Sequence, residues 1–122
     1  MMTPQELQLE LIRHTDRMAC GADRVVDDLN KHRDLWRAAL MDQPVLNLQS
    51  AGLVIDLAKL RGLGEGVWNV EYLYILSSGK DDRKLAAIVK CWKPDEFGWL
   101  APRLAEERTG ERGARILYAW WD

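Results

Sequence analysis

The chain has 122 residues, of which 48% are apolar and 30% are charged, and its formal net charge is −2. This composition is that of a globular domain. It excludes a disordered chain and any long-range electrostatic attraction for nucleic acid or anionic lipid. We therefore expect one domain over residues 1–122 with its own hydrophobic core, and we do not expect nucleic acid as a partner.

The cysteines and the N-terminus indicate the cellular compartment. Cys20 and Cys91 lie far apart and neither belongs to a C-x-x-C pair, so we expect both to be reduced and to form no zinc site. The first residues lack the basic region and apolar run of a secretion signal, and no apolar run approaches the ~20 residues that cross a bilayer. We expect a cytoplasmic protein without membrane contact.

The start of the chain carries a helix signal. Thr3 is a good N-cap, Pro4 suits the first helical position, and Glu6 completes the pattern of a capping box. Two apolar stripes at helical spacing follow, one on each side of Gly21. Their members are Leu7, Leu11, His14 and Met18, and then Val25, Leu29, His32, Trp36, Ala39 and Leu40. Residues 4–41 are predicted to form one long helix or a helical hairpin, and the glycine favours a break.

The middle of the chain predicts a helix and then a strand. Ser50 can cap a helix over residues 50–61, and the glycines within 62–66 end it. Residues 67–76 are rich in β-branched and aromatic side chains and are apolar on both faces, which is typical of a strand covered on two sides. We expect this strand at the centre of a sheet.

Residues 84–93 decide the fold class. Asp81 or Asp82 can cap a helix there, and apolar residues follow at helical spacing until a proline ends the pattern. A β-hairpin through the same turn is the alternative, and it would make the fold α+β. With the helix, the remaining elements are a strand at 97–100, a helix at 102–109 and a strand at 114–121.

Residues 67–121 are therefore predicted to form a βαβαβ unit, which gives an α/β fold with a small three-stranded sheet. Parallel strands joined through helices cross over right-handed, so both connecting helices are expected on one face of the sheet. The helical N-terminal half is expected to pack on the other face.

Two segments superficially resemble phosphate sites. Ser77–Lys80 follows a strand and precedes a helix, but the full phosphate-loop pattern is absent because Asp81 stands where serine or threonine is required. We interpret this segment as a turn with a helix cap. Four arginines between residues 103 and 115 could form a phosphate surface, but interleaved glutamates nearly cancel their charge.

Few polar side chains suggest chemistry. His14 and His32, the only histidines, lie eighteen residues apart, so they share a metal or general-base site only if the helices fold back on each other. Asp95 and Glu96 begin a strand beside tryptophans, where apolar rings could raise the pKa of a carboxyl group. We interpret all four mainly as local structural side chains, and we expect no catalytic residue, no metal and no cofactor.

Six tryptophans in 122 residues are the most distinctive feature of the sequence. Trp36 and Trp92 fall on apolar helix faces and are predicted to lie in the core. The candidate interface or binding residues lie near strand ends: Trp68, Trp99, Tyr118, Trp120 and Trp121. Because neighbouring residues of a strand point to opposite sides, the terminal pair cannot share one buried face, and one of the two is expected to meet a second subunit or a ligand.

Two functional hypotheses from different classes follow. The first is a non-catalytic regulatory or protein-interaction module that acts as a homodimer, with another protein as an additional candidate partner. The second is a small-molecule-binding protein or an enzyme, with an aromatic-lined pocket between the N-terminal helices and the sheet. The lack of a catalytic or metal signature in the sequence favours the first.

Overall fold

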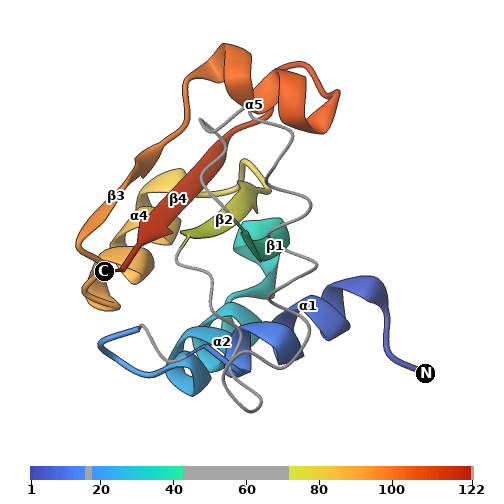
Figure 1. Cartoon of the computed structure of the whole chain (residues 1–122). Coiled ribbons are helices and arrows are strands. Elements are labelled where there is room, and N and C mark those ends of the chain that lie inside the picture. The colour runs from blue at the N-terminus through green and yellow to red at the C-terminus, as the bar shows by residue number, and fades with distance from the viewer. Residues whose placement is uncertain (16–17, 43–71, 122) are drawn as a thin grey trace, which may run out of the picture.

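The computed structural model describes residues 1–15, 18–42 and 72–121, which form a mixed α and β fold (Figure 1). The helices are α1 (Pro4–Arg13), α2 (Ala22–Lys31), α4 (Asp82–Cys91) and α5 (Pro102–Thr109), with a 3-10 turn, η1 (Arg33–Leu35), after α2. The strands are β1 (Trp36–Asp42), β2 (Tyr72–Ser77), β3 (Glu96–Trp99) and β4 (Ile116–Trp120). The predicted helix at 50–61, the glycines of 62–66 and Trp68 lie outside the described residues.

Local signals in the sequence place most helix boundaries correctly. The Thr3 hydroxyl accepts from the Glu6 amide and the Glu6 carboxylate accepts from the Thr3 amide, which completes the capping box. Gly21 has a φ of 93°, a backbone conformation that favours glycine, and it separates α1 from α2 as predicted. Asp81 caps α4, so the helix predicted over 84–93 is confirmed and the hairpin alternative is wrong.

The prediction of a helix up to residue 41 is wrong, because β1 begins at Trp36. This segment contains good helix formers and has apolar residues at helical spacing, yet it pairs along its whole length with β2. One face of this strand is buried, with Ala39 and Met41 in the core, and the other is more exposed, with Leu40 on it. Pairing with a distant strand therefore overrides the local helix propensity.

The prediction of a three-stranded sheet with parallel neighbours is also wrong. The sheet has four strands in the order β1-β2-β4-β3, and all three neighbouring pairs are antiparallel. β2 and β3 do run in the same direction and are joined through α4, but β4 lies between them. The predicted central strand is confirmed, since β2 has a neighbour on each side.

The described helices divide between the two faces of the sheet. α1, α2 and α4 share the main core with one face, and the N-terminal helices pack against β1. α5 lies over the other face, where Ala105 packs with Tyr74 and Ile116. The expectation that both connecting helices share a face is therefore wrong, because the crossover rule governs parallel neighbours and α5 joins antiparallel ones.

The apolar stripe predicted around α1 is half right, because Met18 is buried and Leu11 packs partly buried against the main core. Leu7 is 55% exposed and His14 is exposed, whereas Leu9 and Ile12 are buried against the core. These are the only two buried positions of the ten-residue helix, so the spacing of the leucines alone could not identify which face of α1 is buried.

Three buried tryptophans each satisfy their indole N–H inside the main core. Trp36 donates to the Leu29 carbonyl at 2.8 Å, and Trp92 donates to the Asp28 carboxylate at 2.8 Å. Trp121 donates to the carbonyl of Trp92 at 3.3 Å. These bonds remove the cost of burying a polar group with each ring, and they tie β1, α4 and the C-terminal strand to their neighbours.

One edge of the sheet is closed by a side chain. The amide of Gln5, on α1, donates to the Ala39 carbonyl at 2.7 Å and accepts from the Ala39 N–H at 2.9 Å. A glutamine amide thus bonds both backbone groups of Ala39, which point away from β2, as another strand would. This arrangement protects an edge that could otherwise pair with another chain.

Candidate functional site

The sheet face beneath α5 carries aromatic side chains that the main core does not use. Strand register arranges them in rows across the sheet. The first row is Asp42, Tyr72, Trp120 and Glu96, the second is Leu40, Tyr74, Tyr118 and Gly98, and the third contains Ala38, Leu76 and Ile116. We call this the aromatic face. It is aromatic and acidic at one end and aliphatic at the other.

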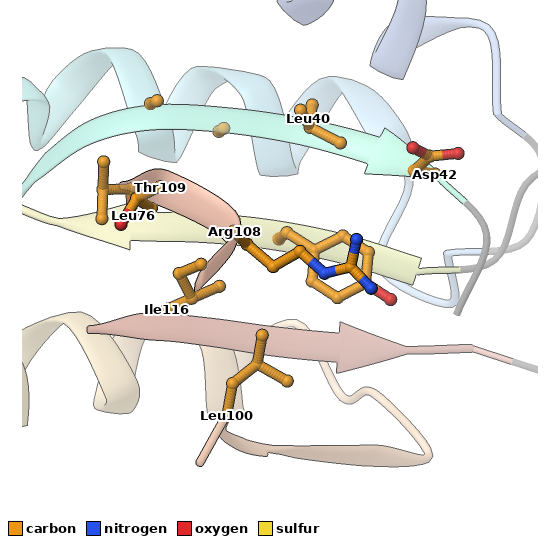
Figure 2. A pocket seen from close by; sticks show the side chains of 10 residues that line it. Leu40, Asp42, Leu76, Leu100, Arg108, Thr109 and Ile116 are labelled. Atoms are coloured by element: carbon orange, nitrogen blue, oxygen red, sulfur yellow. The ribbon is translucent and has the colours of Figure 1, made fainter. Parts of the chain in front are cut away.

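A groove of about 350 Å³ lies on the aromatic face. Its lining is mostly apolar, and its members are Ala38, Ala39, Leu40, Asp42, Tyr74, Leu76, Leu100, Arg108, Thr109 and Ile116. In Figure 2, Arg108 reaches from α5 along the groove toward the end where Asp42 lies, and Leu76 and Ile116 lie toward the opposite end. The groove therefore has a charged end and an aliphatic end.

Three aromatic rings cluster around the ring of Tyr72 beside this groove. The ring centroid of Tyr72 lies 6.0 Å from that of Tyr74, 6.5 Å from that of Tyr118 and 6.2 Å from that of Trp120. Offset and tilted rings at such distances attract each other. The aromatic face is therefore a packed platform and not a set of independent rings.

Tyr118 crosses over β3 to reach Glu96. Gly98 stands opposite Tyr118 in the ladder, and a Cβ built on this glycine would lie 3.5 Å from the tyrosine ring. The ring thus rests on the glycine, and its hydroxyl donates to the Glu96 carboxylate at 2.9 Å. This bond to Glu96 is the main cause of a raised pKa of Tyr118, because the carboxylate favours the protonated phenol.

The raised pKa predicts a pH effect on stability. The folded chain keeps the phenol proton above pH 10.0, the ordinary value, where the unfolded chain loses it, so stability falls as pH rises through this window. We expect Glu96→Gln to lower the pKa of one tyrosine in a titration of absorbance at 295 nm. Tyr118→Phe should abolish that response to Glu96→Gln. An unchanged titration in Glu96→Gln would contradict the assigned bond.

The terminal tryptophans point to opposite faces, as the alternation predicted. Trp121 is 1% exposed in the main core, whereas Trp120 is half-buried on the aromatic face beside Tyr72. Trp99 is half-buried against the main core, and the Arg115 guanidinium lies over its ring at 4.4 Å from the centroid. Of the described candidate residues, Tyr118 and Trp120 therefore share one surface.

The candidate polar residues are dispersed. His14 follows α1 and is exposed, and His32 follows α2 and is half-buried. Asp95 donates its backbone N–H to the Trp120 carbonyl, and Glu96 binds Tyr118. In the part of the chain that the structure describes, no group of three or more histidine, cysteine or acidic side chains could hold a metal ion.

The segment Ser77–Lys80 is a turn with a helix cap, as interpreted from the sequence. The Ser77 hydroxyl accepts from Gly79 N–H and bonds the Asp82 carboxylate, and Asp81 accepts from the Lys84 amide. Lys80 forms an ion pair with Asp34 at 2.6 Å. The Gly79 and Lys84 amides and the Lys80 ammonium therefore have partners within the protein, which argues against a phosphate-binding loop.

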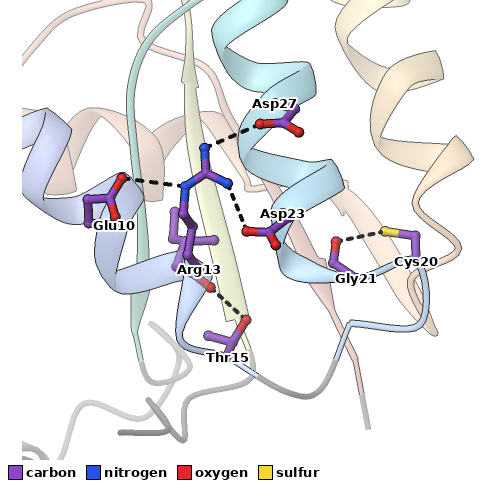
Figure 3. A network of polar contacts seen from close by, with 8 residues as sticks. Glu10, Arg13, Thr15, Cys20, Gly21, Asp23 and Asp27 are labelled. Atoms are coloured by element: carbon purple, nitrogen blue, oxygen red, sulfur yellow. Dashed lines mark hydrogen bonds and ion pairs between the residues drawn. The ribbon is translucent and has the colours of Figure 1, made fainter.

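An exposed network joins α1 to α2 (Figure 3). Arg13 bonds Asp23 at 2.8 Å and Asp27 at 3.2 Å, and its Nε lies 3.4 Å from Glu10. The bond to Asp23 is the main cause of the raised pKa of Arg13.

The Cys20 thiol lies near this network and contacts the Gly21 carbonyl, and burial is the main cause of the raised pKa of the thiol. A raised pKa leaves less of the reactive thiolate at neutral pH.

Sequence reasoning missed the groove, and Arg108 with it. Its lining comes from β1, β2, α5, the segment that precedes α5, and β4, which are distant in the chain. In the sequence, Arg108 is one of four arginines whose charge the interleaved glutamates nearly cancel, and only the strand order brings it to the face that holds Asp42. The only sequence signal was the apolar character of the central strand on both faces.

Comparisons with known proteins bring no assignment: no family model, no curated protein and no solved structure matches the chain. Among the described residues, no helix combines the length and apolar character that a bilayer crossing requires.

Proposed function

We propose that the protein is a non-catalytic interaction module that acts as a homodimer, assembled through the outer edge of β3. The observation that carries this proposal is the difference between the two edges of the sheet. At the β1 edge, the Gln5 amide occupies both outward backbone groups of Ala39. β3 is the opposite edge strand, and the same protection is not seen along it in the described residues.

The backbone of β3 is arranged for pairing. Leu100 N–H donates to the Ile116 carbonyl at 2.9 Å, so by the two-residue alternation the backbone groups of Gly98 and Glu96 also face β4. Those of Phe97 and Trp99 then point outward. The Phe97 side chain is 37% exposed, so part of its ring is accessible to a second copy at this edge.

A symmetric pairing is compatible with the charges of β3. If two copies pair antiparallel about Phe97, Glu96 lies opposite the partner's Gly98, so no like charges face each other. The two sheets then continue into one sheet of eight strands, and the contact is the same on both copies, as a two-fold dimer requires.

Solution mass tests the proposal. We expect size exclusion with light scattering to give twice the 14.0 kDa of one chain. Phe97→Pro removes the ring and the outward N–H while sparing the bonds to β4, and it should yield monomer. Phe97→Thr is the matched control, because it removes the ring but keeps the N–H, and it should weaken the dimer less. A wild-type monomer at all concentrations would refute the proposal.

Ligand binding is a second candidate function, and the groove on the aromatic face favours it. At about 350 Å³ the groove is within the roughly 300–1,000 Å³ range of small-molecule sites. It lies beneath α5, and not between the N-terminal helices and the sheet, where Leu9, Ile12 and Val26 belong to the packed core.

A further inference from the structure

We infer that the groove binds a small zwitterion with an aliphatic body, of the class of a free apolar α-amino acid. This inference rests on the second candidate function, ligand binding in the groove. It follows from three properties of the lining: one cationic side chain (Arg108), one anionic side chain (Asp42), and a remainder that is mainly aliphatic, with one aromatic ring (Tyr74) and one hydroxyl (Thr109).

The charged groups set the polar end of the ligand. Arg108 is directed toward the end of the groove where Asp42 lies (Figure 2). A guanidinium has five N–H donors and a carboxylate has about four acceptor positions, so each can take a ligand group beside an existing partner. Arg108 complements a carboxylate, which it can bind in a bidentate way, and Asp42 complements an ammonium group.

The apolar part of the lining indicates the chemical character and size of the rest of the ligand. Leu76, Ile116 and Leu100 supply aliphatic surface away from the charged end, and Ala38 leaves space between them and β1. A branched aliphatic side chain of the size found in valine, leucine or isoleucine can bury its surface there. The volume of about 350 Å³ fits a compact metabolite better than a dinucleotide.

Calorimetric titration of the full chain tests the ligand class with leucine, isoleucine and valine as probes. Three analogues each lack one recognised feature of leucine: 4-methylpentanoate lacks the ammonium, 3-methylbutylamine lacks the carboxylate, and glycine lacks the body. We expect saturable binding of the branched amino acids and at least about 10-fold weaker binding of each analogue. The two singly charged analogues leave Asp42 or Arg108 without its ligand partner, and glycine buries no aliphatic surface.

Variants then assign the charged groups. We expect Arg108→Gln to weaken leucine binding by about 10-fold to 100-fold without affecting 3-methylbutylamine, and Asp42→Asn to weaken leucine without affecting 4-methylpentanoate. Arg103→Gln is the matched control, because Arg103 is on the same helix but pairs with Glu107 on the surface. Equal effects of Arg108→Gln and Arg103→Gln would overturn the assignment.

A hydrophobic dye distinguishes two negative results: a groove that binds ligands of another class, and a groove that binds no ligand. Anilinonaphthalene sulfonate should bind the wild-type chain, and Ala38→Phe, which fills the groove, should reduce its binding. If the dye binds this way but amino acids neither bind nor displace it, the groove is a binding site and the inferred class is wrong. If neither dye nor amino acids bind, both the class and the second candidate function are wrong.

Discussion

Trp121→Ala is expected to destabilise the protein by about 3–5 kcal/mol, a large part of the roughly 5–15 kcal/mol that holds a domain folded. Trp121 is 1% exposed, and its indole N–H bonds the Trp92 carbonyl. The truncation leaves a cavity against α4 and an unsatisfied carbonyl. Urea unfolding followed by far-ultraviolet circular dichroism measures the loss without relying on tryptophan fluorescence, and the midpoint of thermal unfolding should fall by roughly 10–20 °C.

The neighbouring residue supplies a matched control. Trp120→Ala removes the same side chain from a half-buried site on the aromatic face, so we expect a loss of only about 1–2 kcal/mol. Equal losses in the two variants would mean that both rings are buried to the same extent, contrary to the strand alternation. The comparison therefore tests which of the two faces forms the main core.

Trp92 should show the second large effect, because it is fully buried and joins α4 to α2. Trp92→Ala is expected to cost about 3–5 kcal/mol. Trp92→Phe retains most of the apolar contact but removes the N–H that bonds Asp28, and should cost about 1–2 kcal/mol. Denaturant unfolding measures both values.

A double-mutant cycle isolates the bond between the two helices. Asp28→Ala, which removes the acceptor, combined with Trp92→Phe gives the coupling energy between the indole and the carboxylate, which we expect to be about 1 kcal/mol. Additive losses from the two changes would show that the 2.8 Å contact contributes nothing to stability.

Features that depend on residues close together in the sequence are predicted correctly. The capping box at Thr3, the break at Gly21 and the cap at Asp81 involve residues within a few positions of one another, and all three are confirmed. The opposite orientation of Trp120 and Trp121 depends only on the two-residue repeat of a strand. Such features need no knowledge of the rest of the chain.

The errors arise where distant segments meet. β1 carries helix-forming residues and becomes a strand only because β2 pairs with it. β4 lies between β2 and β3, and this position depends on how two helices pack on the sheet. No sequence pattern within β4 predicts it. The groove depends on that strand order, so its two charged lining residues, Asp42 and Arg108, could not be recognised together in the sequence.

The Gln5 side chain also bears on how large an assembly the chain can build. A sheet with two open edges can add copies at both ends and grow into a fibre. Here the glutamine amide occupies the outward groups of Ala39 at one edge, so the pairing proposed for β3 would use the remaining edge and stop at two chains. In that proposal, a single side chain on the first helix separates a finite particle from an open-ended polymer.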